Sequence, residues 1–191
     1  DHHNEEVLVN MVRSHGIEDL AFLFLLNAIC VAIPGLSNGI FCVLNGILYG
    51  PAWGFIVNWI SDILGQIILM ELLQKLYDMK KMSNSKVYKL LTGLKSPMLG
   101  LIIGYMIPFI PSATVSYVNI MINKGQRKKQ LIPIIIGVIP FAYLYAYGGD
   151  SILHLDGPRL IKVVISFVVI ALIAVAILLS LRAIKKRTKK A

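Results

Sequence analysis

Apolar stretches of two lengths alternate with polar segments along this chain. The longer ones, residues 51–73, 131–149 and 160–182, have about the 20 residues that an α-helix needs to cross a bilayer. Each stretch predicts a transmembrane helix, and the third of these helices is the C-terminal one. A short polar loop is expected at 150–158. The stretch 131–149 carries Pro133, Gly137 and Pro140 in its interior, so we expect that helix to be kinked.

The shorter apolar runs are broken by proline and glycine. Residues 19–33 fall short of a full crossing, stop at Pro34 and Gly35, and are followed by a second short run, 40–49. Two short helices around such a tip predict a re-entrant hairpin, because broken backbone at membrane depth is tolerated only where it is buried in protein or lines a wet cavity. The alternative is one true span up to Ile33 followed by a loop.

The same pattern returns in residues 98–123. This stretch carries Pro108 and Pro111 between two short apolar runs, and proline removes a backbone donor and breaks an α-helix. We therefore expect a second re-entrant hairpin, in which residues 98–107 enter the membrane and residues 111–123 leave it.

The two predicted hairpins show a faint internal repeat. With an offset of 74 residues, Ile33-Pro34 lands on Ile107-Pro108 and Asn45 lands on Asn119. Each hairpin also precedes a predicted spanning helix, so the chain reads as two related halves.

The distribution of charge predicts opposite orientations for these halves. Lysine and arginine collect at 75–95, 124–129 and 182–190, which is the bias of cytoplasmic loops. With these segments inside, repeat 1 (19–73) and repeat 2 (98–149) enter the membrane from opposite sides. Inverted repeats of broken helices are a transporter architecture. We predict an all-α integral membrane protein with an inverted repeat and a cytoplasmic C-terminus.

The composition agrees with a cell-membrane protein. The chain has 191 residues, of which 57% are hydrophobic, a mean hydropathy of +0.73 and a net charge of +9. The membrane domain is expected over 18–150, after an amphipathic surface segment at 1–17, with a short surface helix at 86–94. The basic tail, 183–191, should touch anionic lipid headgroups, not nucleic acid. A homo-oligomer stays open.

The sequence contains no pattern typical of an enzyme. It shows no ordered Ser/His/Asp set, no histidine-rich metal pattern and no Gly-Lys phosphate loop. Its two cysteines, Cys30 and Cys42, fit no zinc spacing. We predict a protein that is not an enzyme and that uses no metal or cofactor.

Polar residues recur every four positions in the first spanning helix, so that Asn58, Asp62 and Gln66 share one face. A carboxylate near mid-span costs about 2.5–3.5 kcal/mol, and such residues usually mark a pathway. We predict a transport or proton site of these three residues and Glu71. The alternatives are a neutral Asp62 hydrogen-bonded to Asn58 or to a hairpin end, and a Glu71 that reaches the cytoplasmic interface.

The predicted hairpins also carry candidate substrate-binding residues, most of them with small hydroxyl or amide side chains. These are Ser37, Asn38, Asn45, Tyr105, Ser112, Thr114, Ser116 and Asn119. Half-helices that begin near Asn38 and Ser112 would also attract a phosphate at their amino ends. The alternative is that these side chains hydrogen-bond between helices. The hairpin tips and kinks are assigned to Pro34, Gly35, Pro108, Pro111 and Pro140.

The order of these motifs resembles a known family. A Pro-Gly tip is followed by NGILYGPAWG from Asn45 to Gly54, and later by IPFIP from Ile107 to Pro111 and IGVIP from Ile136 to Pro140. Over roughly residues 17–150 the chain resembles the DedA superfamily, also called the VTT-domain or SNARE-associated Golgi protein family.

This resemblance implies a protein that moves lipids between leaflets: undecaprenyl phosphate or phospholipids in bacteria, with some members dependent on the proton gradient, and scrambled phospholipids in eukaryotes. The chain departs from the family at Tyr105 and, for the DedA branch, at Pro111, where arginines are common. It also lacks the acid that this branch carries before its first tip, since Asn27 to Ile33 contains none.

Three functions are therefore open. The leading prediction is a lipid translocase or scramblase, with proton coupling through Asp62 as an option. The alternatives are a proton-coupled transporter of a small soluble solute and a non-transporting membrane assembly or lipid-organising protein. A groove open laterally to lipid favours the first, a closed wet cavity the second, and the lack of a polar cavity the third.

Overall fold

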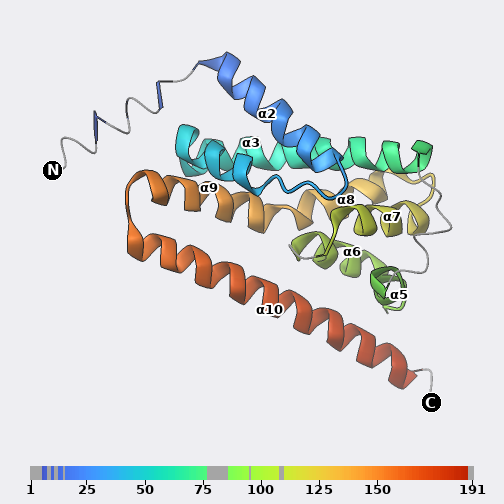
Figure 1. Ribbon diagram of the computed structural model, residues 1–191. Helices are drawn as coiled ribbons and strands as arrows, with labels where there is room; N and C mark the ends of the chain where they lie inside the picture. Colours follow the sequence, from blue (N-terminus) through green and yellow to red (C-terminus); the bar gives the residue numbers. More distant parts are fainter. Residues whose placement is uncertain are drawn as a thin grey trace.

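The computed structural model describes residues 6, 7, 10, 13, 14, 16–76, 86–94, 96–107 and 110–188, except for the side chains of 87 and 184–188. Regular structure in this part of the chain is helical throughout, without strands, so the all-α prediction is confirmed (Figure 1). The helices are α2 (Ile17–Ala32), α3 (Gly39–Leu76), α5 (Lys86–Thr92), α6 (Pro97–Met106), α7 (Ser112–Ile122), α8 (Arg127–Gly137), α9 (Ile139–Leu153) and α10 (Gly157–Thr188).

Three helical segments of the described chain are long and apolar enough to cross a membrane, namely Gly39–Leu76, Arg127–Leu153 and Gly157–Ala183. They contain the three stretches predicted to span, and they run lengthwise through the molecule (Figure 1). The helix α5 agrees with the short helix predicted at 86–94.

Helix α3 consists of two arms that meet at Gly50. This residue has φ +77° and ψ 178°, a conformation that favours glycine. Pro51 then opens the second arm, in the first turn, where its missing N–H costs least. Because Pro51 cannot donate to the carbonyl of Ile47, that oxygen is free to accept from elsewhere. It accepts a hydrogen bond of 3.5 Å from the Nε of Arg13.

The kink predicted in 131–149 is confirmed. Helix α8 ends at Gly137 and α9 begins at Ile139, with Pro140 in the first turn of α9. Gly137 also lets α6 approach closely, because a Cβ added there would lie 2.6 Å from the Cβ of Tyr105 and 2.7 Å from the Ile102 carbonyl oxygen.

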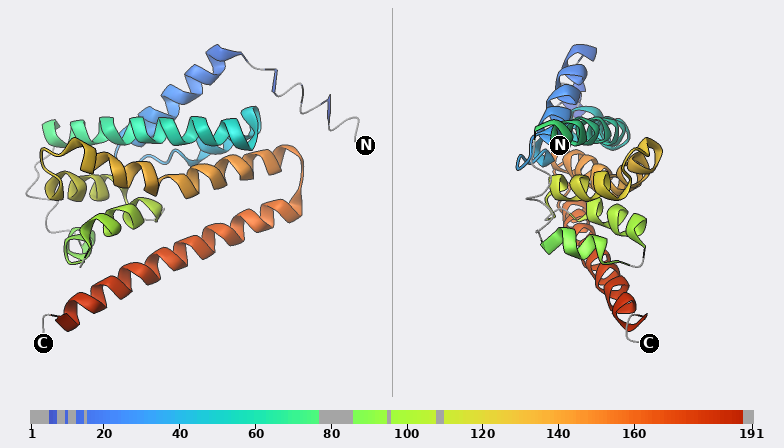
Figure 2. Two further views of the ribbon diagram at one scale, coloured as in Figure 1. Left: turned by 180° about the vertical axis from the view of Figure 1, so that it is seen from behind. Right: turned by 90° about the vertical axis from the view of Figure 1, so that its right-hand side faces the viewer.

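Two pairs of short helices lie at opposite ends of the molecule. Helix α2 and the first arm of α3 extend toward the end where α9 turns into α10, and α6 and α7 extend toward the other end (Figures 1 and 2). Leu36 and Ser37 of the first connecting segment (33–38) and Ile107, Ile110 and Pro111 of the second (107–111) line one cavity between the two pairs. The short helices predicted on each side of the two tips are thus present, whereas Pro108 lies outside the described residues.

Glycine allows the first arm of α3 to touch α9 backbone to backbone. A Cβ added to Gly46 would lie 2.1 Å from the Ala146 carbonyl oxygen, and one added to Gly149 would lie 2.1 Å from the Val43 carbonyl oxygen. Gly65 plays the same part toward α2, where an added Cβ would lie 2.5 Å from the Val31 side chain. These contacts fix the first helix pair against the long helices.

The prediction of a polar loop at 150–158 is wrong. Helix α9 continues to Leu153, α10 begins at Gly157, and Asp150 is buried with 4% of its surface exposed. Asp150 can lie inside the fold because Arg13 and Arg159 pair with it there.

Two terminal predictions fall mostly outside the described residues. The amphipathic segment predicted at 1–17 is described only in part, and so is the basic tail at 183–191. The backbone of α10 continues to Thr188, beyond the predicted end of the last span at residue 182.

Candidate functional site

Asp62 lies near the middle of the second arm of α3 and is 9% exposed. Its Oδ1 accepts hydrogen bonds from the amide of Asn27 on α2, at 3.1 Å, and from the amide of Asn38 in the first connecting segment, at 2.7 Å. Asn27 also donates to Ser61. The first helix pair therefore supplies two neutral donors to this carboxylate.

The polar stripe of α3 faces the interior as predicted, since Asn58 and Gln66 are 0% and 5% exposed. Asn58 does not bind Asp62. It donates to the carbonyl oxygens of Cys42 and Ala142 and accepts from Asn45. Of the alternatives for Asp62, the hydrogen bond to a hairpin end is present through Asn38, and the one to Asn58 is not.

A second polar network joins α3 to the other helix pair. The Ser116 hydroxyl donates to Gln66 Oε1 at 2.9 Å and lies 2.9 Å from the Tyr105 hydroxyl. The amide of Asn119 lies 3.4 Å from the Tyr105 hydroxyl and donates to the carbonyl oxygen of Gln130 on α8, at 2.8 Å. At the position where the family resemblance would place an arginine, Tyr105 thus takes part in a network without formal charge.

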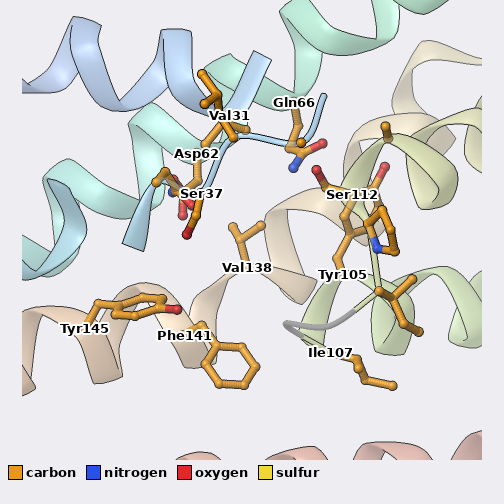
Figure 3. A pocket seen from close by; sticks show the side chains of 16 residues that line it. Val31, Ser37, Asp62, Gln66, Tyr105, Ile107, Ser112, Val138, Phe141 and Tyr145 are labelled. Atoms are coloured by element: carbon orange, nitrogen blue, oxygen red, sulfur yellow. The ribbon is translucent and has the colours of Figure 1, made fainter. Parts of the chain in front are cut away.

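The two helix pairs enclose a cavity of about 370 Å³ between their connecting segments, which we call the central cavity (Figure 3). Its polar lining consists of Ser37, Asn38, Asp62, Gln66, Tyr105, Ser112 and Tyr145. Among the described residues that line it, Asp62 is the one charged side chain, and no lysine, arginine or histidine is present.

Apolar residues form the rest of the cavity wall. Val138, at the break between α8 and α9, lies at its centre in Figure 3, next to Phe141, and Val31 lies above Asp62. Exposed residues of both connecting segments, among them Leu36 and Pro111, form part of its rim. The cavity therefore opens at the surface, between the two segments.

The structure brings together some of the predicted site residues and separates others. Ser37, Asn38, Asp62, Gln66, Tyr105 and Ser112 line the cavity, whereas Asn45, Asn58, Thr114, Ser116 and Asn119 do not. Glu71 is remote from the cavity, half exposed, and paired with Arg127 at the start of α8. The tip residues Gly35 and Pro111 line the cavity, and Pro34 and Pro140 do not.

Sequence reasoning missed several residues of the site, among them Asn27 beside Asp62 and three residues of the cavity wall at 138–145. Asn27 was the one amide side chain in the apolar run 19–33, which is the signal that could have identified it. Val138, Phe141 and Tyr145 carried no such signal, since they look like any apolar or aromatic residues of a spanning helix and reach the cavity only through the kink after Gly137.

Asp150 forms a second charged cluster, at the far end of α9. Arg13 pairs with one of its carboxylate oxygens, Arg159 lies 3.6 Å from the other, and the Nδ1 of His154 lies 3.5 Å away. The Nδ1 of the half-buried His154 also lies 2.8 Å from the Asp150 carbonyl oxygen. This cluster ties the N-terminal segment to α9 and α10.

Comparison with known proteins leaves the family open, because no family model, no curated protein and no solved structure matches this chain.

Proposed function

We propose that this protein is a lipid translocase or scramblase of the cell membrane, related to the DedA superfamily, with its C-terminus in the cytoplasm. The observation that carries the proposal is a partly polar cavity beside Asp62, lined by exposed residues of both connecting segments, among them the apolar Leu36 and Pro111. Such a cavity would shelter a headgroup while the acyl chains stay in the bilayer.

The depth of the cavity follows from the position of Asp62. The second arm of α3, from Pro51 to Leu76, is about 39 Å long at 1.5 Å per residue, and Asp62 lies about 17 Å from its beginning. The hydrocarbon core of a bilayer is about 30 Å thick. A cavity beside Asp62 would therefore lie near the midplane, where a headgroup that moves between leaflets has to be protected.

The direction of the opening favours a lipid over a soluble solute. Leu36, at the rim, is 54% exposed, and Pro111 is exposed as well. If these residues lie near the midplane, their surroundings are acyl chains, not water. A substrate could enter from the side with its tails outside, which a water-soluble solute has no reason to do.

Two matching contacts support the inverted repeat and the re-entrant hairpins. Asn45, in the first arm of α3, hydrogen-bonds to Asn58 in the second arm. In the other pair, Asn119 of α7 hydrogen-bonds to the Gln130 carbonyl of α8. These two asparagines are the ones related by the 74-residue offset. With each pair entering from its own end, as in Figure 2, the two halves would be inverted and their tips would meet at the midplane.

Reconstitution tests the proposal. Purified protein is placed in unilamellar vesicles whose lipids carry a fluorophore on one acyl chain, and dithionite bleaches the outer leaflet. Protein-free vesicles should lose about half the signal, and vesicles that contain the protein should lose nearly all of it. A loss of only half in both would overturn the proposal.

A plugged cavity provides a matched control. Val138→Trp should fill the central cavity and stop translocation, because Val138 lines the cavity between its two polar walls (Figure 3). Ile136→Trp, two residues earlier and 45% exposed, should leave translocation intact. Equal translocation rates in the two variants would mean that lipids do not cross through this cavity.

Cysteine accessibility tests the arrangement in the membrane. Single cysteines at Ser37 and Ser112 should be shielded from bulky aqueous reagents on both faces of the membrane, because both positions would be at the midplane. Rapid labelling of each from its own aqueous side would make the connecting segments ordinary loops and remove the re-entrant hairpins.

A further inference from the structure

The central cavity holds a buried carboxylate that has no basic partner among the described residues, and this determines the charge of what fits there. We infer that the headgroup it accepts carries an ammonium group next to its phosphate, so that the substrates are zwitterionic phospholipids, not lipids with an anionic headgroup alone. This inference rests on the proposed function and narrows its substrate class.

The described wall of the cavity carries a single acidic side chain, Asp62. This is the one carboxyl group among the described lining residues, which include no lysine, arginine or histidine, and its two hydrogen bonds come from neutral amides that share Oδ1. A carboxylate away from water needs a cation or a proton to balance it. Because the described wall offers no cation, a headgroup ammonium would supply one, whereas a headgroup with only negative charge would be repelled.

Aromatic side chains lie on the same wall. The hydroxyl end of Tyr145 points into the cavity from α9, below Asp62 and Ser37 (Figure 3). Its ring packs where a side chain on Gly39 would otherwise lie, because a Cβ added there would be 3.3 Å from the ring. Phe141 lies one turn away. Aromatic rings next to a carboxylate are typical of sites that bind ammonium groups.

The other side of the cavity has room for the phosphate. Ser112 lines the cavity across from Asp62, and it is the first residue of α7. The hydroxyl of Ser112 and the amino end of this 11-residue helix would favour an anion. An ammonium near Asp62 and a phosphate near Ser112 would place the two charges of one headgroup on opposite walls.

The experiment compares lipids with identical, acyl-labelled chains and different headgroups, in sealed vesicles without any ion gradient. Phosphatidylethanolamine and phosphatidylcholine should cross about tenfold faster than phosphatidylglycerol and phosphatidic acid, which corresponds to about 1.4 kcal/mol of discrimination. In Asp62→Asn this ratio should fall to about one, whereas Asp62→Glu, which keeps the charge, should retain a preference. Glu18→Gln, an exposed acid at the start of α2, should behave like the unmodified protein.

The outcomes separate the inference from the function on which it rests. If no lipid crosses faster than in protein-free vesicles, the proposed function fails. If all four lipids cross equally fast, or the anionic ones cross faster, translocation stands and the inference is overturned. Uptake of water-soluble glycerophosphoethanolamine by the same vesicles tests whether the transported headgroup has to belong to a lipid. Uptake at the lipid rate would overturn a lipid substrate in favour of a soluble one.

Discussion

Asp62 and Asp150 are both buried carboxylates on long helices, and they differ in their partners. Asp150 is 4% exposed and has Arg13, Arg159 and His154 around it. Asp62 is 9% exposed, and its partners among the described residues are the amides of Asn27 and Asn38. The first is neutralised by its own fold at one end of the molecule. The second lies beside a cavity at the centre and lacks a cationic partner among the described residues.

This difference indicates which carboxylate is structural and which is functional. A charge that the fold already balances can hold helices together but has little left to offer a ligand. A carboxylate held only by neutral donors can exchange a proton or an ammonium group without breaking an ion pair. Asp150 therefore holds helices together at one end of the molecule, whereas Asp62 is a candidate binding group at its centre.

The largest expected effect is on the charged cluster around Asp150. Asp150→Ala should lower the free energy of unfolding by about 3 kcal/mol, because it removes one partner of a buried ion pair and leaves Arg13 without its carboxylate. The measurement is unfolding in mixed micelles titrated with SDS, followed by circular dichroism.

A double variant separates the charge from the packing. Arg13→Met combined with Asp150→Leu removes both charges, so it should regain most of the stability lost in Asp150→Ala, since apolar pairs often replace buried ion pairs at little cost. A double variant as unstable as the single one would mean that the cluster does not act as an ion pair.

The next effect is on transport. Asp62→Asn keeps an oxygen that can accept from Asn27 and Asn38, so its free energy of unfolding should change by less than about 1 kcal/mol. It cannot bind and release a proton, and a proton gradient should therefore no longer change the rate of lipid movement. The measurement is translocation with and without an imposed gradient, and Glu18→Gln is the control. Acceleration by the gradient in Asp62→Asn would exclude Asp62 as the proton site.

A smaller effect is expected in the network without formal charge. Tyr105→Phe removes the hydroxyl shared by Ser116 and Asn119, but Ser116 keeps Gln66 and Asn119 keeps the Gln130 carbonyl. Because no buried partner is left unsatisfied, the loss should be about 1 kcal/mol. The control is Tyr143→Phe at a 46% exposed position of α9, which should not change the unfolding transition. A loss above that of Asp150→Ala would contradict this ranking of the two kinds of network.

The sequence predicted the elements well because their signals are local. Run length identified the spanning helices, and prolines and glycines marked the breaks at 34–39 and 137–140, where the helices do end. Four-residue spacing also predicted correctly that Asn58, Asp62 and Gln66 face inward. Each of these inferences depends on residues that are close together in the chain.

The partners of the polar residues could not be predicted in the same way. Asp150 was expected in a polar loop, and its pairing could not be foreseen because its partner Arg13 lies 137 positions away in the sequence. Tyr145 and Phe141 reach the cavity only through the tertiary arrangement of a kinked helix. Residue type predicts that a buried acid needs a partner, but the fold decides whether the partner is an arginine, an amide or a cavity.

The smallest effect is expected at Glu71, a third carboxylate that was predicted to share the site of Asp62. Its side chain is 36% exposed and that of its partner Arg127 is 58% exposed, so water and salt screen the pair. Exposed pairs of this kind contribute roughly 0–1 kcal/mol. Glu71→Gln should therefore lower the free energy of unfolding by less than about 0.5 kcal/mol in the SDS titration, with no difference left at high salt. Lipid movement should keep its dependence on the proton gradient. If Glu71→Gln abolished that dependence and Asp62→Asn did not, the proton site would lie at the end of α3, and the contrast between Asp62 and Asp150 would no longer identify the functional carboxylate.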